Sequence, residues 1–451
     1  MRLPTPPKAS GAAALVRSQA LALALAACAP SWALDLGEAI AAATAHDPAL
    51  RASSLSREAD RLGRDAAESK LWPQVYLQGS SSATGQTTTQ DTFFGPSTTT
   101  FSGPSGSHQL SLRQGLLRPR DLIGVDVAEL QAMRGELRYQ ADQADLWSRT
   151  ASAWLEAAAV GQQLRLLDGA LLATAGALAQ ERARYARGES TREAVAEALA
   201  QHESLGAARA DKRLGLQAQR RAFALLTGLP EDVLDGVALR PEPPAPLQRL
   251  GDSAAVGELV EQALERAAAR LDVELGAKRL RQAEVDHYPT LDLTASIASA
   301  RNDATSTQGY SYLNRQVGLQ YTVPIYTGGG LTAAKGQASR AYEASQAQSQ
   351  AVANRLESQL WSLAAAEAGA LERCRADELV VAAAREQLNF AARAYAQGLQ
   401  TKGDLANAEA VLARRSVDRV QNLLGVYRTQ LGLLKSLPTG HPLWQRWLAG
   451  L

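Results

Sequence analysis

The residues able to do acid–base or metal chemistry are scattered through this chain of 451 residues. Its five histidines show no metal-ligand spacing; they are His46, His108, His202, His287 and His441. The glycine run 328–330 lacks the Lys-Ser/Thr that completes a phosphate-binding loop, so we expect a turn between a strand and a helix there. No sequence-local catalytic motif is present. These observations predict a protein that is not an enzyme and holds no metal or cofactor.

Composition and charge narrow the remaining classes. A net charge of +1 gives no basis for nucleic-acid binding. Beyond the first 33 residues, no apolar run reaches the roughly eighteen residues of a membrane-spanning helix. Only 5% of the residues are aromatic and alanine is abundant, which indicates long, closely packed helices rather than one large globular core. Two cysteines, Cys28 and Cys374, do not make a disulfide framework, and we expect Cys374 to be a packed helical side chain.

Residues 1–33 have the features of a secretory signal peptide. Arg2, Lys8 and Arg17 precede an apolar stretch at 20–27, and Ser31-Trp32-Ala33 fits a cleavage site. A lipoprotein signal is the alternative, in which Cys28 becomes a lipidated N-terminus. We favour cleavage after residue 33, because the helical pattern starts at residue 36 and leaves little room for a tether. Both alternatives predict export.

Residues 288–330 read as two strands joined by a polar loop. Apolar and polar side chains alternate over 291–298 and again over 317–326, which is the period of a β-strand, and the loop covers 299–315. The apolar face has four lipid-facing candidates: Leu291, Leu293, Leu319 and Val323. A lone hairpin is marginal in water, and few nearby apolar segments could cover it. A closed transmembrane β-barrel solves this problem, because lipid takes one face and a polar lumen takes the other.

A weaker hairpin is predicted earlier in the chain. Its strands lie around Val75–Leu77 and Leu110–Leu112, separated by a long Ser/Thr/Gly loop at 79–107 that carries Phe93 and Phe94. Helical patterns fill the rest, over 36–70, 119–187, 191–227, 256–286, 331–397 and about 401–437. The helices at 119–187 and 331–397 would each measure about 100 Å. Each ends at a glycine, Gly188 or Gly398.

The order helix, hairpin, long helix, return helix occurs twice, as a repeat of about 210 residues. We therefore divide the chain into a signal peptide (1–33), a first repeat (34–250), a second repeat (251–438) and a C-terminal tail (439–451). The fold class is mainly α with a small β part. Four strands per chain cannot enclose a water-filled channel, but twelve strands from three copies can. A homotrimer is the expected assembly.

The chain resembles the TolC-like family of outer membrane export channels over nearly its whole mature length. The matching residues are Leu36–Ile40, Asp47–Leu50, Val323–Gly329, and the series Tyr395, Gly398, Thr401, Asp404 and Asn407. The resemblance implies a trimer with a twelve-stranded barrel in the outer membrane of a Gram-negative cell and a long antiparallel α-helical barrel through the periplasm. It also implies docking to a periplasmic adaptor and to an inner membrane ABC or proton-driven transporter. The tip turns at Gly188, Gly398 and Thr401 are the expected docking points.

The same resemblance implies that acidic residues just beyond the second turn narrow the periplasmic mouth of the tunnel. The matching positions are Asp404 and Asn407, with Ala194 and Glu197 as their first-half counterparts. Asn407 stands where the family usually has an acid, which puts a strong cation-binding ring in doubt. Thr401-x-x-Asp404 and Ser190-x-x-Glu193 also resemble capping boxes, in which the carboxylate satisfies a helix end. Asp404 could gate, cap or do both.

Two classes of function remain. The first is an export duct, for type I secretion of proteins or alternatively for efflux of small molecules. The second is a periplasmic coiled-coil scaffold, which has no use for lipid-compatible strands. The start after residue 33, without a clear lipid tether, favours protein secretion.

Overall fold

The computed structural model describes residues 34–247, 253–302 and 310–450, so the predicted signal peptide, including Cys28, lies outside the described residues. The first half contains α2 (Leu36–His46), α3 (Pro48–Ser69), β1 (Gln74–Thr92), β2 (Gly95–Leu117), α4 (Pro119–Ala186), α5 (Arg192–Thr227) and η2 (Glu231–Leu234). The second contains α6 (Ser253–Gln262), α7 (Leu264–Val285), β3 (Thr290–Asn302), β4 (Tyr310–Thr322), α8 (Gly330–Ala396), α9 (Lys402–Leu434) and α10 (Pro442–Ala449). The predicted mainly helical fold with four strands is confirmed.

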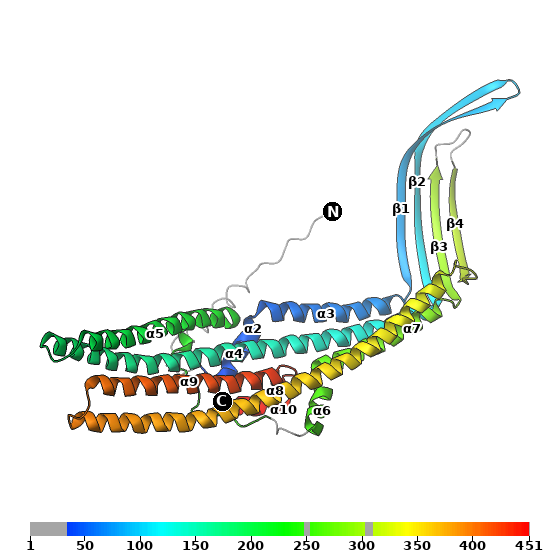
Figure 1. The fold of residues 1–451 in the computed structure, drawn as a ribbon. Coiled ribbons are helices and arrows are strands. Elements are labelled where there is room, and N and C mark those ends of the chain that lie inside the picture. Colours follow the sequence, from blue (N-terminus) through cyan, green and yellow to red (C-terminus); the bar gives the residue numbers. More distant parts are fainter. Residues whose placement is uncertain (1–33, 248–252, 303–309, 451) are drawn as a thin grey trace, which may run out of the picture.

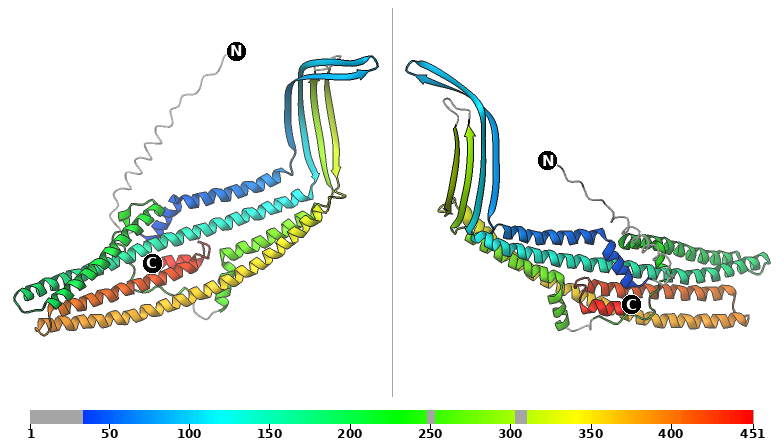
Figure 2. Two further views of the ribbon diagram at one scale, coloured as in Figure 1. Left: turned by 45° about the horizontal axis from the view of Figure 1, so that its top comes forward. Right: turned by 180° about the vertical axis from the view of Figure 1, so that it is seen from behind.

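The helices form an elongated layer with the sheet at one end and the tip turns at the other (Figure 1). At 68 and 67 residues, α4 and α8 are each about 100 Å long. Near the sheet, α4 packs between α3 and α7, and α7 also packs on α8. Near the tips, α4 packs between α5 and α9, and α9 also packs on α8. The layer therefore has one edge made by α3 and α5 and another made by α8 (Figure 2).

Two of the expected helices are each split into two. The helix expected over 36–70 breaks at Asp47, whose backbone is extended and whose side chain accepts a hydrogen bond from Ala49 N at 3.1 Å. Pro48 then starts α3, a position where its missing N–H costs nothing. The helix expected over 256–286 breaks at Ala263, after which Leu264 N donates to Ser436 O at 3.0 Å. The turn expected at 328–330 is present, with Gly328 and Gly329 at φ +62° and +81°.

The four strands form one antiparallel sheet in the order β1-β2-β3-β4. Its register pairs Leu293 with Leu319 and Leu291 with Tyr321, so these side chains share one face. The next rows on that face pair Val75 with Leu112 and Leu77 with Leu110. The opposite face carries polar residues such as Gln74, Ser111, Thr294 and Gln320. Near the helical end of the sheet, the predicted segregation of apolar and polar faces is confirmed on all four strands. Farther along, Arg315 and His108 lie on the same face as the apolar residues.

Two predictions about the strands were wrong. Val323 lies just beyond β4, which ends at Thr322. The segment 79–107 is not a loop, because β1 and β2 run through it to a tight turn at Phe93-Phe94. Its hydroxyl side chains bond across the strands, as in the Ser82–Ser105 pair at 2.7 Å and the Thr87–Thr100 pair at 3.1 Å. β3 and β4 likewise extend into the predicted loop at 299–315, of which residues 303–309 lie outside the described part.

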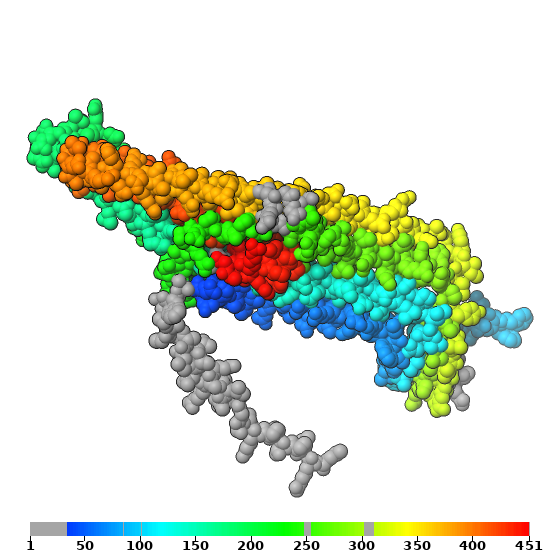
Figure 3. Space-filling view, turned by 90° about the horizontal axis from the view of Figure 1, so that it is seen from below, coloured from blue at the N-terminus to red at the C-terminus, as the bar shows by residue number. Residues whose placement is uncertain are grey.

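The main core lies midway along the helices, where α2, α4, α6, α8, α9 and α10 meet. The C-terminal tail contributes α10, which is lodged between neighbouring segments (red in Figure 3) and buries Trp444 and Trp447. Trp447 Nε1 donates to Gln430 Oε1 at 2.9 Å, and Gln430 Nε2 donates to buried Glu367 at 2.7 Å. This network joins α10, α9 and α8. Within the described part of the chain, no helix has the length and hydrophobicity needed to cross a bilayer.

Candidate functional site

The two tip turns have the same backbone geometry. Gly188 and Gly398 adopt φ +77° and +73°, a conformation that side chains disfavour and that commonly ends a helix. Gly188 N donates to Tyr185 O at 2.9 Å, and Gly398 N donates to Tyr395 O at 3.0 Å. The sequence match between the two halves therefore corresponds to a repeated local structure, and both turns lie at the far end of the molecule from the sheet (Figure 1).

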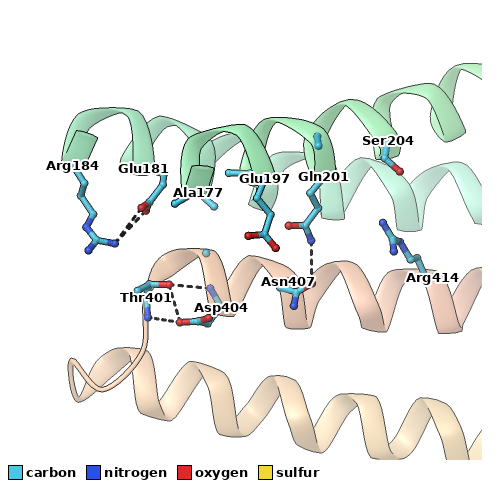
Figure 4. A pocket seen from close by; sticks show the side chains of 14 residues that line it. Ala177, Glu181, Arg184, Glu197, Gln201, Ser204, Thr401, Asp404, Asn407 and Arg414 are labelled. Carbon is cyan, nitrogen blue, oxygen red and sulfur yellow. Dashed lines mark hydrogen bonds and ion pairs between the residues drawn. The ribbon is translucent and has the colours of Figure 1, made fainter. Parts of the chain in front are cut away.

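A complete capping box starts α9. Thr401 N and Thr401 Oγ1 both lie 2.8 Å from Asp404 Oδ2, and Asp404 N donates to Thr401 Oγ1 at 3.2 Å. The predicted capping role of Asp404 is confirmed. Its carboxylate folds back onto its own helix end, as Figure 4 shows.

The corresponding prediction for Ser190 was wrong. The N-cap of α5 is Thr191, whose side chain accepts from Ala194 N at 3.2 Å. The hydroxyl of Ser190 instead donates to Glu181 of α4. The cap therefore lies one residue later than predicted, because Thr191 is the residue with an extended backbone immediately before the first helical residue, Arg192.

A groove of about 610 Å³ lies between α5 and α9, over α4. All three predicted aperture residues, Glu197, Asp404 and Asn407, line it, and so does Thr401. Gln201 Nε2 of α5 donates to Asn407 Oδ1 of α9 at 3.2 Å across the groove (Figure 4). The structure thus brings together residues that are separated by about half of the sequence.

The charges around this groove are mostly paired near the turn. Arg184 contacts Glu181 at 3.2 Å, and Arg187 contacts Glu189 at 3.0 Å. The hydrogen bond from Arg187 holds the pKa of the Glu189 carboxyl below its ordinary value. Glu197 is exposed, points into the groove in Figure 4, and makes no hydrogen bond or ion pair with any described residue.

Sequence reasoning missed Gln201, Glu181 and Arg414, which also line the groove. Glu197 and Gln201 are four residues apart and therefore share a helix face, which is a signal in the sequence. The neighbouring sequence does not indicate which helix this face packs against. The bond to Asn407 depends on α4 separating α5 from α9 by one helix width.

A second polar cluster lies where the sheet joins the helices. Asp292 of β3 is 4% exposed, and its carboxylate lies 2.7 Å from Arg113 Nη2 and 2.6 Å from Arg118 Nε. Arg113 belongs to β2, and Arg118 immediately precedes α4. Gly115 allows this approach, because a Cβ there would lie 2.6 Å from the Arg118 side chain. The cluster fixes the strand-to-helix joint of the first repeat to the second hairpin.

The predicted lipid-facing residues differ in how much of each side chain is exposed. Leu319 is 64% exposed, whereas Leu291 and Leu293 are half-buried. Val323 is also exposed, although it lies outside the strand. Apolar side chains are exposed at successive positions of one strand face, such as Val317 and Leu319 on β4. Contact of such a continuous apolar face with water is energetically unfavourable.

Known proteins match both the sequence and the fold. The sequence profile described as "Outer membrane efflux protein" matches residues 39–229 and 256–437. The protease secretion protein PrtF of Dickeya chrysanthemi is 26% identical over 400 residues, covering 86% of this chain and 85% of PrtF. The alkaline protease secretion protein AprF of Pseudomonas aeruginosa is 25% identical over 388 residues, covering 85% and 80%. The Campylobacter jejuni CmeC outer membrane channel has a similar fold, with a TM-score of 0.73 at 14% identity over 91% of this chain and 88% of CmeC. The chain belongs to the outer membrane efflux protein family.

Proposed function

We propose that three copies of this chain form a duct that exports protein through the outer membrane by type I secretion. The observation that carries the proposal is the open sheet: β1 and β4 are its edges, and one of its faces is apolar. Unpaired strand edges are not tolerated in lipid, so the sheet must close with other chains. Copies joined edge to edge around a closed ring satisfy every strand.

The helical layer supports the same assembly. Its edges are α3 with α5 on one side and α8 on the other, so they follow the sheet edges β1 and β4. Each edge carries exposed apolar side chains: Leu55 and Leu62 on α3, Leu214 on α5, and Leu379 and Phe390 on α8. Packing α3 and α5 of one copy on α8 of the next covers them and closes a helical tunnel continuous with the barrel.

In this duct the tips form the periplasmic mouth. The turns at Gly188, Gly398 and Thr401 are the docking points for a periplasmic adaptor, which in turn binds an inner membrane transporter. Glu197, Asp404 and Asn407 border the aperture. Asp404 is engaged in its capping box, so Glu197 is the aperture carboxylate left free to repel or attract passing charges.

The names of PrtF and AprF, both described as protease secretion proteins, favour protein cargo exported beside an ABC transporter. Small-molecule efflux beside a proton-driven pump is the second candidate. It is favoured by the description of the family as efflux proteins.

The proposal is tested by measuring which proteins are secreted by a strain from which the gene for this chain has been deleted. Loss of the gene should remove specific proteins from the medium, and the wild-type chain should restore them, as quantified by mass spectrometry of the medium and of the cells. Gly398→Val should fail to restore secretion although it assembles, because a β-branched residue strains the left-handed turn. Gly425→Ala is the matched control, since its Cβ meets open space.

Unchanged secretion together with increased sensitivity to toxic small molecules would favour efflux instead. If the purified chain remained a monomer in lipid, the duct itself would be refuted.

A further inference from the structure

The first hairpin continues past the described part of the second. β1 and β2 pair along their whole length, but the last described pair between β2 and β3 is Ser105 with Asn302. Residues 83–92 and 95–104 therefore form a two-stranded ribbon beyond the described end of the four-stranded sheet. The ribbon bends away from the sheet direction (Figures 1 and 2). At about 3.3 Å per residue, it extends roughly 33 Å.

The ribbon is polar but its tip is aromatic. Threonine hydroxyls bond across the strands, as in the Thr89–Thr98 pair at 3.1 Å. At the turn, Phe93 and Phe94 are 99% and 96% exposed and touch only edge to face, with ring centroids 5.6 Å apart. Large apolar side chains gain by leaving water, and an isolated two-stranded ribbon is marginal by itself. The tip is therefore expected to pack against a partner.

Charge argues against a lipid surface as that partner. Residues 79–107 contain no Lys or Arg, and Asp91 is their one charged residue. Aromatic segments that rest on anionic lipid are normally held there by neighbouring cations. The ribbon contains no such Lys or Arg.

Reach favours other copies of the chain. In a closed barrel of twelve strands, spaced about 4.8 Å apart and tilted about 40°, the radius is about 12 Å. The ribbon is more than twice as long as this radius, so it is long enough to reach the barrel axis when it bends over the lumen. The Ser and Thr faces of the ribbon are uncharged, and Asp91, two residues before Phe93, is the one charge that each copy brings near the tip.

We propose that the Phe93–Phe94 tips of three copies pack on one another above the barrel and narrow its outer opening. The proposal rests on the trimer proposed above. It gives the duct a second constriction, at the opposite end from the aperture bordered by Glu197, and makes both ends of the path depend on contacts between copies.

Disulfide crosslinking tests the contact. Phe93→Cys, in a Cys374→Ser background of the full chain, should form an oxidised dimer within the folded trimer, because tethered tips meet at a high effective concentration. Thr88→Cys is the matched control: it is exposed on the same strand but lies about 16 Å from the tip. The Cys374→Ser chain without a tip cysteine is the blank. The double variant Phe93→Ser and Phe94→Ser should raise single-channel conductance in planar bilayers, and Thr88→Ser should not.

A trimer that shows no crosslink at position 93, or equal crosslinking at positions 93 and 88, overturns the tip contact while leaving the duct intact. Quenching of a Phe93→Trp fluorophore by brominated lipid overturns it as well, because the tip then lies in the membrane. A chain that stays monomeric in lipid overturns both the tip contact and the duct.

Discussion

At the residue scale, Asp404 binds its own helix end twice, through Thr401 N and Thr401 Oγ1. Asp404→Ala should therefore destabilise the first turn of α9 by about 1 kcal/mol. Hydrogen exchange of the amides at 402–405 measures this local opening. Thr191→Ala, which removes the single cap of α5, is the control and should weaken only the first turn of α5. Increased conductance without faster exchange in Asp404→Ala would instead assign the residue to the aperture.

Asp145 provides a pH-dependent contact on α4. Burial by itself raises the pKa of this carboxyl, but hydrogen bonds from Lys435 and Arg149 outweigh burial and hold the pKa below its ordinary value. Its contribution to stability is then fully present above about pH 4 and is lost as pH falls through the lowered pKa. Thermal unfolding of wild type and Asp145→Asn should differ at pH 7 and converge in acid. A constant difference across pH would refute the assignment.

At the element scale, the spacing of α3 and α4 depends on Gly135. Its position is buried, and a Cβ there would lie 2.3 Å from Asp60 Oδ2 and 3.2 Å from Asp60 Cβ. Gly135→Ala should therefore destabilise the protein, although alanine normally favours a helix by about 0.5–1 kcal/mol over glycine. Gly336→Ala on α8 meets open space and should stabilise by that amount. Melting temperatures of the two variants should shift in opposite directions; equal shifts would show that α3 adjusts freely.

At the scale of the whole molecule, the two faces of the sheet must meet different surroundings. Leu319 lies on the apolar face and Gln320 on the polar face, opposite Asp292. Leu319→Arg should destabilise the barrel by roughly 2–4 kcal/mol if the residue lies near the bilayer midplane. Gln320→Arg should be tolerated. The yield of heat-labile trimer in detergent checks both variants, and equal tolerance would mean that the assignment of faces is wrong.

Local patterns in the sequence determined the elements and their faces. Alternation in 291–298 and 317–322 determined which strand residues share a face, because side-chain direction in a strand depends only on position along it. Gly188 and Gly398 end the long helices in a left-handed backbone conformation, which glycine adopts without the steric cost of a Cβ. Thr401 and Asp404 were recognisable as a cap because both partners lie within one helical turn.

The tertiary structure decided the features that depend on a partner far away in the sequence. Residues 79–107 have the composition of a loop, but most of them form strands, in which hydroxyl pairs such as Ser82–Ser105 and Thr87–Thr100 bond from one strand of the hairpin to the other. Gln201 reaches Asn407, and Arg113 and Arg118 reach Asp292, only because helix and strand packing brings the two halves of the chain together. A contact between distant segments depends on the order and spacing of whole elements, and no window of sequence contains that information.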